Sequence, residues 1–187
     1  MKRHIWLVSL LWMLTAPLAW AATIEEVTFA ERHQIEHTTL RLNNVGLLRY
    51  RIVIKAYVAA LYLGEGAQPE AVLSDVPKRL ELHYFWGIAG PDFGKAADTI
   101  LADNVSTEVL RSLRSRLDRL HALYENVKPG DRYSLTYLPG RGTELALNGT
   151  PKGVIEGADF AAAYFAIWLG AKPLDRSLRD QLLKNDE

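Results

Sequence analysis

The spacing of apolar residues changes its period three times along the chain, and this constrains the fold more than any single motif. Apolar and polar residues alternate over 79–86, "RLELHYFW", which is typical of a half-buried strand. Helical spacing then places apolar residues on one face of 93–101, behind Asp92 as a candidate cap. After Ser106 the same spacing continues over 110–127. Two consecutive helices are therefore expected in the middle of the chain.

Strand-like segments return in the second half and are followed by a second pair of helices. Residues 131–155 contain alternating stretches, and Asn148-Gly149 is a two-residue hairpin signal. The segment 159–170, "DFAAAYFAIWLG", is apolar on nearly every side, which indicates a buried helix, and a short helix is expected from about 175 to 183. Strands, helices, strands and helices in this order predict an α+β domain, with helices packed on a mostly antiparallel sheet.

The first strands are expected between residues 27 and 63. Residues 27–42 predict one or two short strands, closed by the turn-like "NNVG" at 43–46. The run that follows, "GLLRYRIVIKAYVAALYL", is mostly apolar and is interpreted as one long strand over 48–63.

Cations interrupt this apolar run at positions that alternation would place together. In a single strand Arg49, Arg51, Lys55 and Tyr57 share one face, because neighbouring side chains point to opposite sides. One interpretation is that this face is simply exposed to water. The other is that a guanidinium and a phenol converge on a carboxylate or an enolate-like oxygen.

The N-terminus has the organisation of a secretory signal peptide. A basic segment at 2–4 precedes an apolar run at 5–18, and "AWA" then matches the small-x-small cleavage pattern. The run is shorter than the roughly 20 residues that a membrane span needs. We expect cleavage of residues 1–21 before Ala22, no stable membrane anchor afterwards, and a periplasmic domain at 22–187.

Composition narrows the classes of function. Removal of Lys2 and Arg3 leaves 20 basic residues against 22 acidic ones, so no nucleic-acid partner is expected. The chain has no cysteine, which excludes disulfides and thiol chemistry. No phosphate-binding loop, dinucleotide fingerprint or nucleophile elbow occurs, and no cofactor is expected.

Two further patterns have a plain structural interpretation beside a functional one. The motif "HQIEH" at 33–37 has the spacing of one group of zinc proteases, but β-type residues follow it and no third ligand is evident, so no metal site is predicted. Arg111, Arg114, Arg116 and Arg119 lie on the polar side of the second helix. A solvated outer face is favoured over a membrane-surface helix.

The chain resembles chalcone isomerase-like proteins, of the exported bacterial branch. The resemblance spans about 24 to 183, and the order and spacing of four segments carry it: "GLLRYRIVIKAYVAALYL", "FGKAADTILADN", "KPGDRYSLTYLPGRGTELALNG" and "FAAAYFAIWLG". It implies an open-faced β-sandwich, with helices over one face of a large sheet and a ligand cleft between them.

The resemblance also suggests ligand-binding residues. Arg49 is similar to the arginine that stabilises the enolate in the plant isomerases, and Tyr57 falls where those enzymes have a threonine. Phe93 falls near their tyrosine and lacks its hydroxyl, and Asn104 is the nearest asparagine. Most hydrogen-bond donors of the isomerase site are therefore missing, and no catalytic residue is assigned.

Another branch of this fold binds fatty acids through an arginine and a tyrosine, with an apolar tunnel for the chain. Arg49 and Tyr57 resemble that pair, with Lys55 as an assistant. Several aromatic residues are candidates for a tunnel lining or for ordinary core packing: Tyr84 or Phe85, Trp86, Phe93, Tyr164 and Trp168.

Three hypotheses of function follow. The leading one is a non-catalytic protein that binds an amphipathic or carboxylate small molecule, such as a fatty acid, between sheet and helices. The second is an isomerase, that is, an intramolecular lyase, on an unknown substrate. The third is a periplasmic protein-interaction module that uses the arginine face of the second helix, through Arg114 and Arg119, with an unidentified protein partner.

Overall fold

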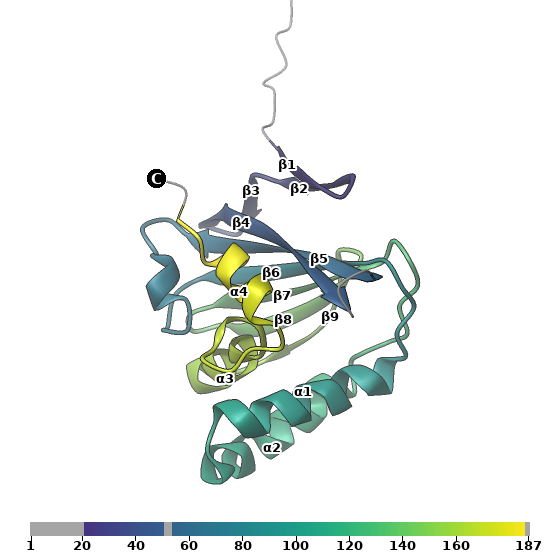
Figure 1. Cartoon of the computed structure of the whole chain (residues 1–187). Coiled ribbons are helices and arrows are strands. Elements are labelled where there is room, and N and C mark those ends of the chain that lie inside the picture. Colours follow the sequence, from purple (N-terminus) through teal and green to yellow (C-terminus); the bar gives the residue numbers. More distant parts are fainter. Residues whose placement is uncertain (1–20, 51–53, 186–187) are drawn as a thin grey trace, which may run out of the picture.

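The centre of the molecule is an antiparallel sheet in which each strand pairs with the next one along the chain. The structure is a computed structural model that describes residues 21–50 and 54–185 (Figure 1). Within these residues, a seven-stranded sheet has the order β3-β4-β5-β6-β7-β8-β9. Its strands are β3 (Arg32–Ile35), β4 (Thr38–Tyr50), β5 (Ile54–Gly64), β6 (Lys78–Tyr84), β7 (Arg132–Leu138), β8 (Gly142–Leu147) and β9 (Thr150–Ile155).

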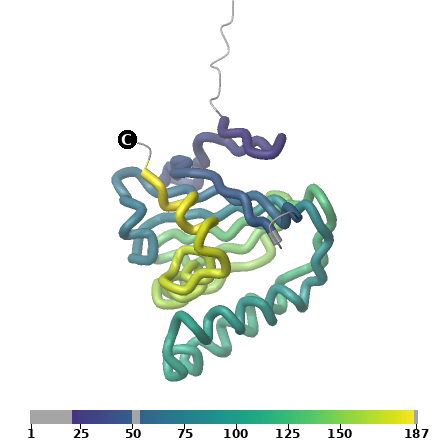
Figure 2. Tube along the Cα trace, in the orientation of Figure 1, coloured from purple at the N-terminus to yellow at the C-terminus, as the bar shows by residue number. Residues whose placement is uncertain are grey.

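The helices and a small hairpin cover opposite sides of this sheet. The helices are α1 (Gly90–Asn104), α2 (Thr107–His121), α3 (Ala158–Leu169) and α4 (Arg176–Leu182), and a short 3₁₀ turn spans Pro69–Ala71. In Figure 1, β1 (Ala21–Ile24) and β2 (Val27–Ala30) lie on one side, and α1 with α2 lie on the other. Figure 2 shows that β1 and the last described residues after α4, in yellow, lie at the same end of the molecule, away from α1 and α2.

Local sequence explains where the helices begin and why α3 is central. Ser106 accepts a hydrogen bond from the amide of Val109 and caps α2, and Asp175 caps α4 in the same way through Leu178. Eight of the 12 residues of α3 are buried, as its continuous apolar sequence predicts. The predicted α+β class, with helices packed on an antiparallel sheet, is confirmed.

Alternation along the strands produces one apolar core on each side of the sheet. On β5, Tyr57, Ala59 and Leu61 pack under the helices. Val58, Ala60 and Tyr62 on the same strand form a second core with the hairpin residues Val27 and Phe29. The period of two in β-structure therefore gives a helix side and a hairpin side to every central strand.

The interpretation of residues 48–63 as one strand is wrong. Strands β4 and β5 form an antiparallel hairpin, in which Leu48 pairs with Tyr57 and Arg49 pairs with Lys55. The register shift between these pairs leaves Ala56 as an extra residue, and such a bulge resets the alternation of side chains. Residues 47–63 contain no Gly or Pro that would signal a break, so the pattern alone suggested a continuous strand. Arg51 lies outside the described residues.

The expected turn at "NNVG" is also wrong, because these residues lie inside β4. A register shift between Leu42 and Asn44 makes Asn43 a bulge, and its side-chain amide donates to the carbonyl of Leu182 at 2.7 Å. A Cβ on Gly46 would lie 2.7 Å from Cδ1 of Leu178. The polar and small residues therefore serve the close approach of α4 to the sheet rather than a turn.

Two helix boundaries differ from those expected. Helix α1 begins at Gly90, so Asp92 lies in its first turn and does not cap it. Helix α2 ends at His121, whereas its apolar stripe suggested a continuation to 127. Val127 instead forms a bridge with Ile88, which ties the loop after α2 to the loop before α1. Among the described residues, no helix is long and apolar enough to span a bilayer.

Candidate functional site

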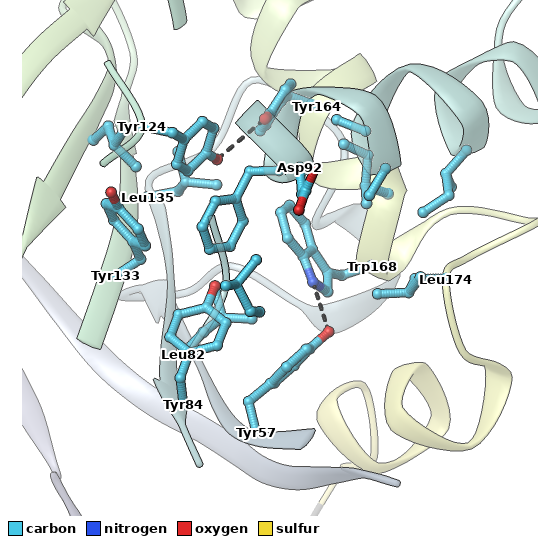
Figure 3. A pocket seen from close by; sticks show the side chains of 17 residues that line it. Tyr57, Leu82, Tyr84, Asp92, Tyr124, Tyr133, Leu135, Tyr164, Trp168 and Leu174 are labelled. Carbon is cyan, nitrogen blue, oxygen red and sulfur yellow. Dashed lines mark hydrogen bonds between the residues drawn. The ribbon is translucent and has the colours of Figure 1, made fainter. Parts of the chain in front are cut away.

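A cavity of about 140 Å³ lies between the sheet and helices α1 and α3 (Figure 3). Its wall is mainly aromatic and aliphatic, with one acidic residue. The aromatic members are Tyr57, Tyr84, Phe93, Tyr124, Tyr133, Tyr164 and Trp168, the aliphatic members are Leu82, Ile88, Ala96, Ala97, Ile100, Leu135, Leu145, Ile167 and Leu174, and the acidic member is Asp92. A concave apolar wall with a few polar groups is the usual form of a small-molecule site.

Regular periodicity places these side chains in the wall. Strand β6 contributes Leu82 and Tyr84, which lie two residues apart and so point to the helix side. Helix α3 contributes Tyr164, Ile167 and Trp168, which recur at three and four residues and share one helical face.

Most tyrosine hydroxyls in the wall have a partner. Trp168 donates its indole N–H to the hydroxyl of Tyr57 at 3.1 Å, and the hydroxyls of Tyr124 and Tyr164 lie 3.1 Å apart. The hydroxyl of Tyr133 donates to the carbonyl of Glu125 at 3.1 Å and accepts from its amide at 2.8 Å.

Tyr84 differs from these tyrosines. It is only 4% exposed, and its hydroxyl has no hydrogen-bond partner among the described residues. Edge contacts hold its ring against Tyr57, Phe93 and Tyr133, at centroid distances of 5.6, 5.7 and 6.3 Å. The unpartnered hydroxyl is therefore fixed in the wall of the cavity.

The tyrosines of the wall remain uncharged over the ordinary pH range. Burial raises the pKa of Tyr57, Tyr84, Tyr124 and Tyr164 well above 10, because the phenolate would lose its hydration.

The only charged residue of the described wall is Asp92. It is exposed at the edge, with its carboxylate 2.9 Å from the ammonium of Lys95. The wall as described contains no lysine or arginine. It therefore offers neutral hydrogen-bond donors and no counter-ion for an acid.

The structure separates the predicted ligand-binding residues into two groups. Tyr57 and Phe93 both line the cavity. Arg49 and Lys55 instead bind the carboxylate of Glu25, in the turn between β1 and β2, with a distance of 3.3 Å from Arg49 Nη2. The single-strand interpretation put Tyr57 beside these cations, but the bulge at Ala56 turns it to the helix side.

Arg49 faces a different, more open hollow. Its side chain is 45% exposed, and the hollow of about 500 Å³ also contains Glu25, Asp175, Ser177 and Gln181. This surface lies between the β1–β2 turn, β4 and the start of α4, and two carboxylates line it.

Asn104 fastens two parts of the backbone together. Its side-chain amide donates to the carbonyls of Lys172 and Ile100 at 2.6 and 3.0 Å, and its side-chain oxygen accepts from the amide of Lys172 at 3.1 Å. The residue therefore ties the end of α1 to the loop between α3 and α4. It is not among the residues that line the cavity.

Some of the aromatic residues predicted to line a tunnel do line the cavity, and others do not. Tyr84, Tyr164 and Trp168 line the cavity with Phe93, whereas Phe85 points to the hairpin side and Trp86 is 58% exposed. Sequence reasoning missed Tyr124 and Tyr133 as wall residues. Tyr133 lies in one of the alternating stretches of 131–155, but nothing in the sequence showed which tyrosines meet.

The histidine motif lies on a strand and a turn rather than on a helix. His33 is on β3, and its Nε2 lies 3.3 Å from Oε2 of Glu81, but without the direction of a hydrogen bond. His37 follows in the turn before β4. Within residues 21–50 and 54–185, no cluster of His, Cys, Asp or Glu is arranged to hold a metal ion.

Three of the four arginines on the polar face of α2 bind neighbouring segments. Arg114 binds Asp98 of α1 at 2.9 Å, Arg116 binds Asp159 at the start of α3, and Arg119 binds Glu156 at 2.6 Å. These contacts fasten α2 to the helix before it and to the segment after β9.

The architecture defines a class: a curled antiparallel sheet with helices over one face and a tyrosine-lined cavity between them. The chain belongs to the chalcone isomerase-like family, whose model matches residues 21–184. Among solved structures, it is similar to the fatty-acid binding protein AtFAP1 of Arabidopsis thaliana, with a TM-score of 0.67 and 14% identity. That match covers 88% of this chain and 96% of the other. A search of curated proteins returned no match.

Proposed function

We propose that the protein is a non-catalytic carrier or sensor that binds a small amphipathic molecule in the cavity between the sheet and helices α1 and α3. The observation that carries the proposal is the wall itself, which is apolar except for tyrosine hydroxyls and Asp92. The similar plant structure is that of a fatty-acid binding protein, which supports an amphipathic ligand with an aliphatic chain, such as a fatty acid or a neutral relative of one.

The size of the cavity limits how much of a ligand it holds. An engineered apolar cavity of about 150 Å³ binds benzene, so about 140 Å³ accepts one ring or a short piece of chain. An open apolar groove of about 320 Å³, lined by Ile54, Ala56, Trp86 and Ile88, adjoins it, since Ile88 also lines the cavity. The groove provides an apolar path for the rest of a longer molecule.

Filling the cavity tests this proposal. Ala97 of α1 is buried in the wall, so Ala97→Leu should occupy part of the cavity and weaken binding of the neutral fluorescent probe N-phenyl-1-naphthylamine by about 10-fold or more. Ala102→Leu is the matched control, because Ala102 lies on the exposed side of the same helix. Fluorescence titration measures both. Equal affinities in the two variants, or no probe binding by the wild type, would refute the proposed site.

An intramolecular lyase is the second candidate. The observation in its favour is the unpartnered hydroxyl of Tyr84, since a fixed donor in an apolar cavity can stabilise a developing enolate. Incubation with a chalcone, followed by absorbance, separates the two functions. Turnover that is lost in Tyr84→Phe supports the enzyme, whereas binding without turnover of this substrate leaves the binding function.

We also propose that the protein belongs to the exported bacterial branch of its family and acts in the periplasm. The support is the sequence of residues 1–21, of which 1–20 lie outside the described structure. Expression of the whole chain, cell fractionation and mass spectrometry should give a periplasmic species that begins at Ala22. A cytoplasmic protein that retains Lys2 and Arg3 would refute export.

A further inference from the structure

We propose that the polar group received inside the cavity is an uncharged hydrogen-bond acceptor, such as the oxygen of a ketone, ester or alcohol, held by the hydroxyls of Tyr84 and Tyr57. This inference rests on the proposed function and specifies its ligand. It predicts that a neutral molecule binds more tightly than the carboxylate of the same chain length.

The first observation is the unpartnered hydroxyl of Tyr84. The side chain is buried and its ring is held on three sides, which fixes the direction of the hydroxyl. Figure 3 shows it among the side chains that line the cavity, without the dashed line that marks a hydrogen bond. The hydroxyl has no partner in the described protein and is not one of its fully enclosed polar atoms, so a ligand oxygen in the cavity can accept its proton.

The second observation is the direction of the hydrogen bond at Tyr57. Indole N–H groups only donate, so the hydroxyl oxygen of Tyr57 accepts from Trp168 and its own proton remains available. No acceptor for that proton occurs among the residues that the structure describes. The rings of Tyr57 and Tyr84 are in edge contact, with centroids 5.6 Å apart, so the two side chains form one part of the wall.

The third observation is the charge of the wall. The residues that line the cavity include Asp92 and no cation. A carboxylate inside would lose its hydration without gaining a counter-ion from the wall, since the nearby Lys95 lies outside the wall and pairs with Asp92 at 2.9 Å. A neutral ligand oxygen accepts from the hydroxyls without the loss of hydration that a charged group would suffer. Arg49 and Lys55 do not change this balance, because they bind Glu25 on the hairpin side.

The test compares three molecules of equal chain length: 2-octanone, 1-octanol and octanoate at pH 7.5. Each displaces N-phenyl-1-naphthylamine from the purified protein, and the two neutral molecules should bind at least about 10-fold more tightly than octanoate. Tyr84→Phe removes one hydrogen bond, so it should weaken the binding of 2-octanone by about 2- to 10-fold more than it weakens the binding of the probe.

Tyr62→Phe is the matched control. Tyr62 is also a buried tyrosine of the sheet whose hydroxyl has no hydrogen-bond partner among the described residues, but it lies on the hairpin side. Its loss should leave all three affinities unchanged. The infrared carbonyl stretch of bound 2-octanone gives an independent readout: it should lie at lower frequency in the wild type and in Tyr62→Phe than in Tyr84→Phe.

The outcomes separate this inference from the proposed function. Octanoate binding as tightly as 2-octanone, or a ketone affinity and carbonyl stretch that Tyr84→Phe does not change, would overturn the neutral acceptor and leave the apolar site in place. Absence of probe binding by the wild type would refute the proposed function, and the inference with it.

Discussion

The two sides of the central sheet are built by the same strands and are filled in different ways. On the helix side, Leu82 and Tyr84 of β6 meet the large rings of α1 and α3, and a cavity remains between them. On the hairpin side, Arg79 and Glu81 of the same strand take part in a network of ion pairs.

Glu81 is the centre of the hairpin side. Its side chain is 5% exposed, Arg79 donates to Oε2 at 3.1 and 2.9 Å, and Arg132 donates to Oε1 at 2.6 Å. Arg132 also lies over the ring of Phe29 in the hairpin, at 4.7 Å. The hairpin side therefore pairs its buried charges within the protein, although the hydroxyl of Tyr62 there has no partner among the described residues. The helix side has no such charge network and leaves a cavity.

The largest expected effect comes from breaking the network on the hairpin side. Glu81→Gln keeps the shape of the side chain but leaves the arginines without their buried counter-charge. The free energy of unfolding should fall by about 3–5 kcal/mol, measured by urea denaturation. The affinity for the fluorescent probe at 20 °C and low urea should change by less than about 2-fold, because Glu81 does not line the cavity.

Glu65→Gln is the control for this prediction. Glu65 pairs with Arg41 at 2.8 Å, but both side chains are exposed, so the loss should be less than about 1 kcal/mol. Equal losses in the two variants would show that burial does not distinguish the network of Glu81.

The contribution of Glu81 to stability should depend on pH. Burial would raise the pKa of Glu81, but His33, Arg79 and Arg132 outweigh burial and lower it to about 2, from an ordinary value of 4.5. Because the unfolded chain takes up the proton first, this stabilisation is complete above about pH 4.5. It is lost as the pH falls toward about 2, and it amounts to about 3 kcal/mol.

Urea midpoints at pH 7, 4 and 2.5 should therefore fall more steeply for the wild type than for Glu81→Gln, with the two converging at low pH. Other carboxyl groups also have a lowered pKa, such as those of Asp131 and Asp159. They are present in both proteins, so their contribution cancels in the difference between wild type and variant. A constant difference between the two proteins from pH 7 to 2.5 would contradict the prediction.

The smallest expected effect is that of Arg49→Ala. Arg49 is partly exposed and pairs with Glu25, so the free energy of unfolding should change by less than about 1 kcal/mol. Affinities for 2-octanone and for the probe should stay within about 2-fold of the wild type. Loss of octanoate binding in this variant alone would instead support the predicted acid clamp at Arg49.

Much of the fold was predictable because its signals are local. Ser106 caps α2, and Asn148 and Gly149 have φ angles of 50° and 79°, as the hairpin turn requires. The alternation over 79–86 identified the inward residues of β6, and the apolar segment 159–170 identified the buried helix α3. Each of these features depends on neighbours within a few residues.

The turn between β4 and β5 shows why the candidate site was harder to predict. The run from 46 to 63 has no residue that demands a turn, so its alternation extended through a hairpin and a bulge at Ala56. That error put Arg49 beside Tyr57. Strand pairing decides on which side each of them lies, and the sequence pattern of a single segment does not contain that information.

The sequence pattern alone was enough for the apolar faces of β6 and α3 and for the start of α2 after Ser106, because covalent geometry sets the periods of helix and strand. Tertiary structure decided what each inward hydroxyl meets. Tyr57 finds Trp168, which lies 111 residues further along the chain, whereas Tyr84 finds no partner in the described structure. Such contacts depend on how distant elements pack, and so the cavity and its free donors appear only in the folded molecule.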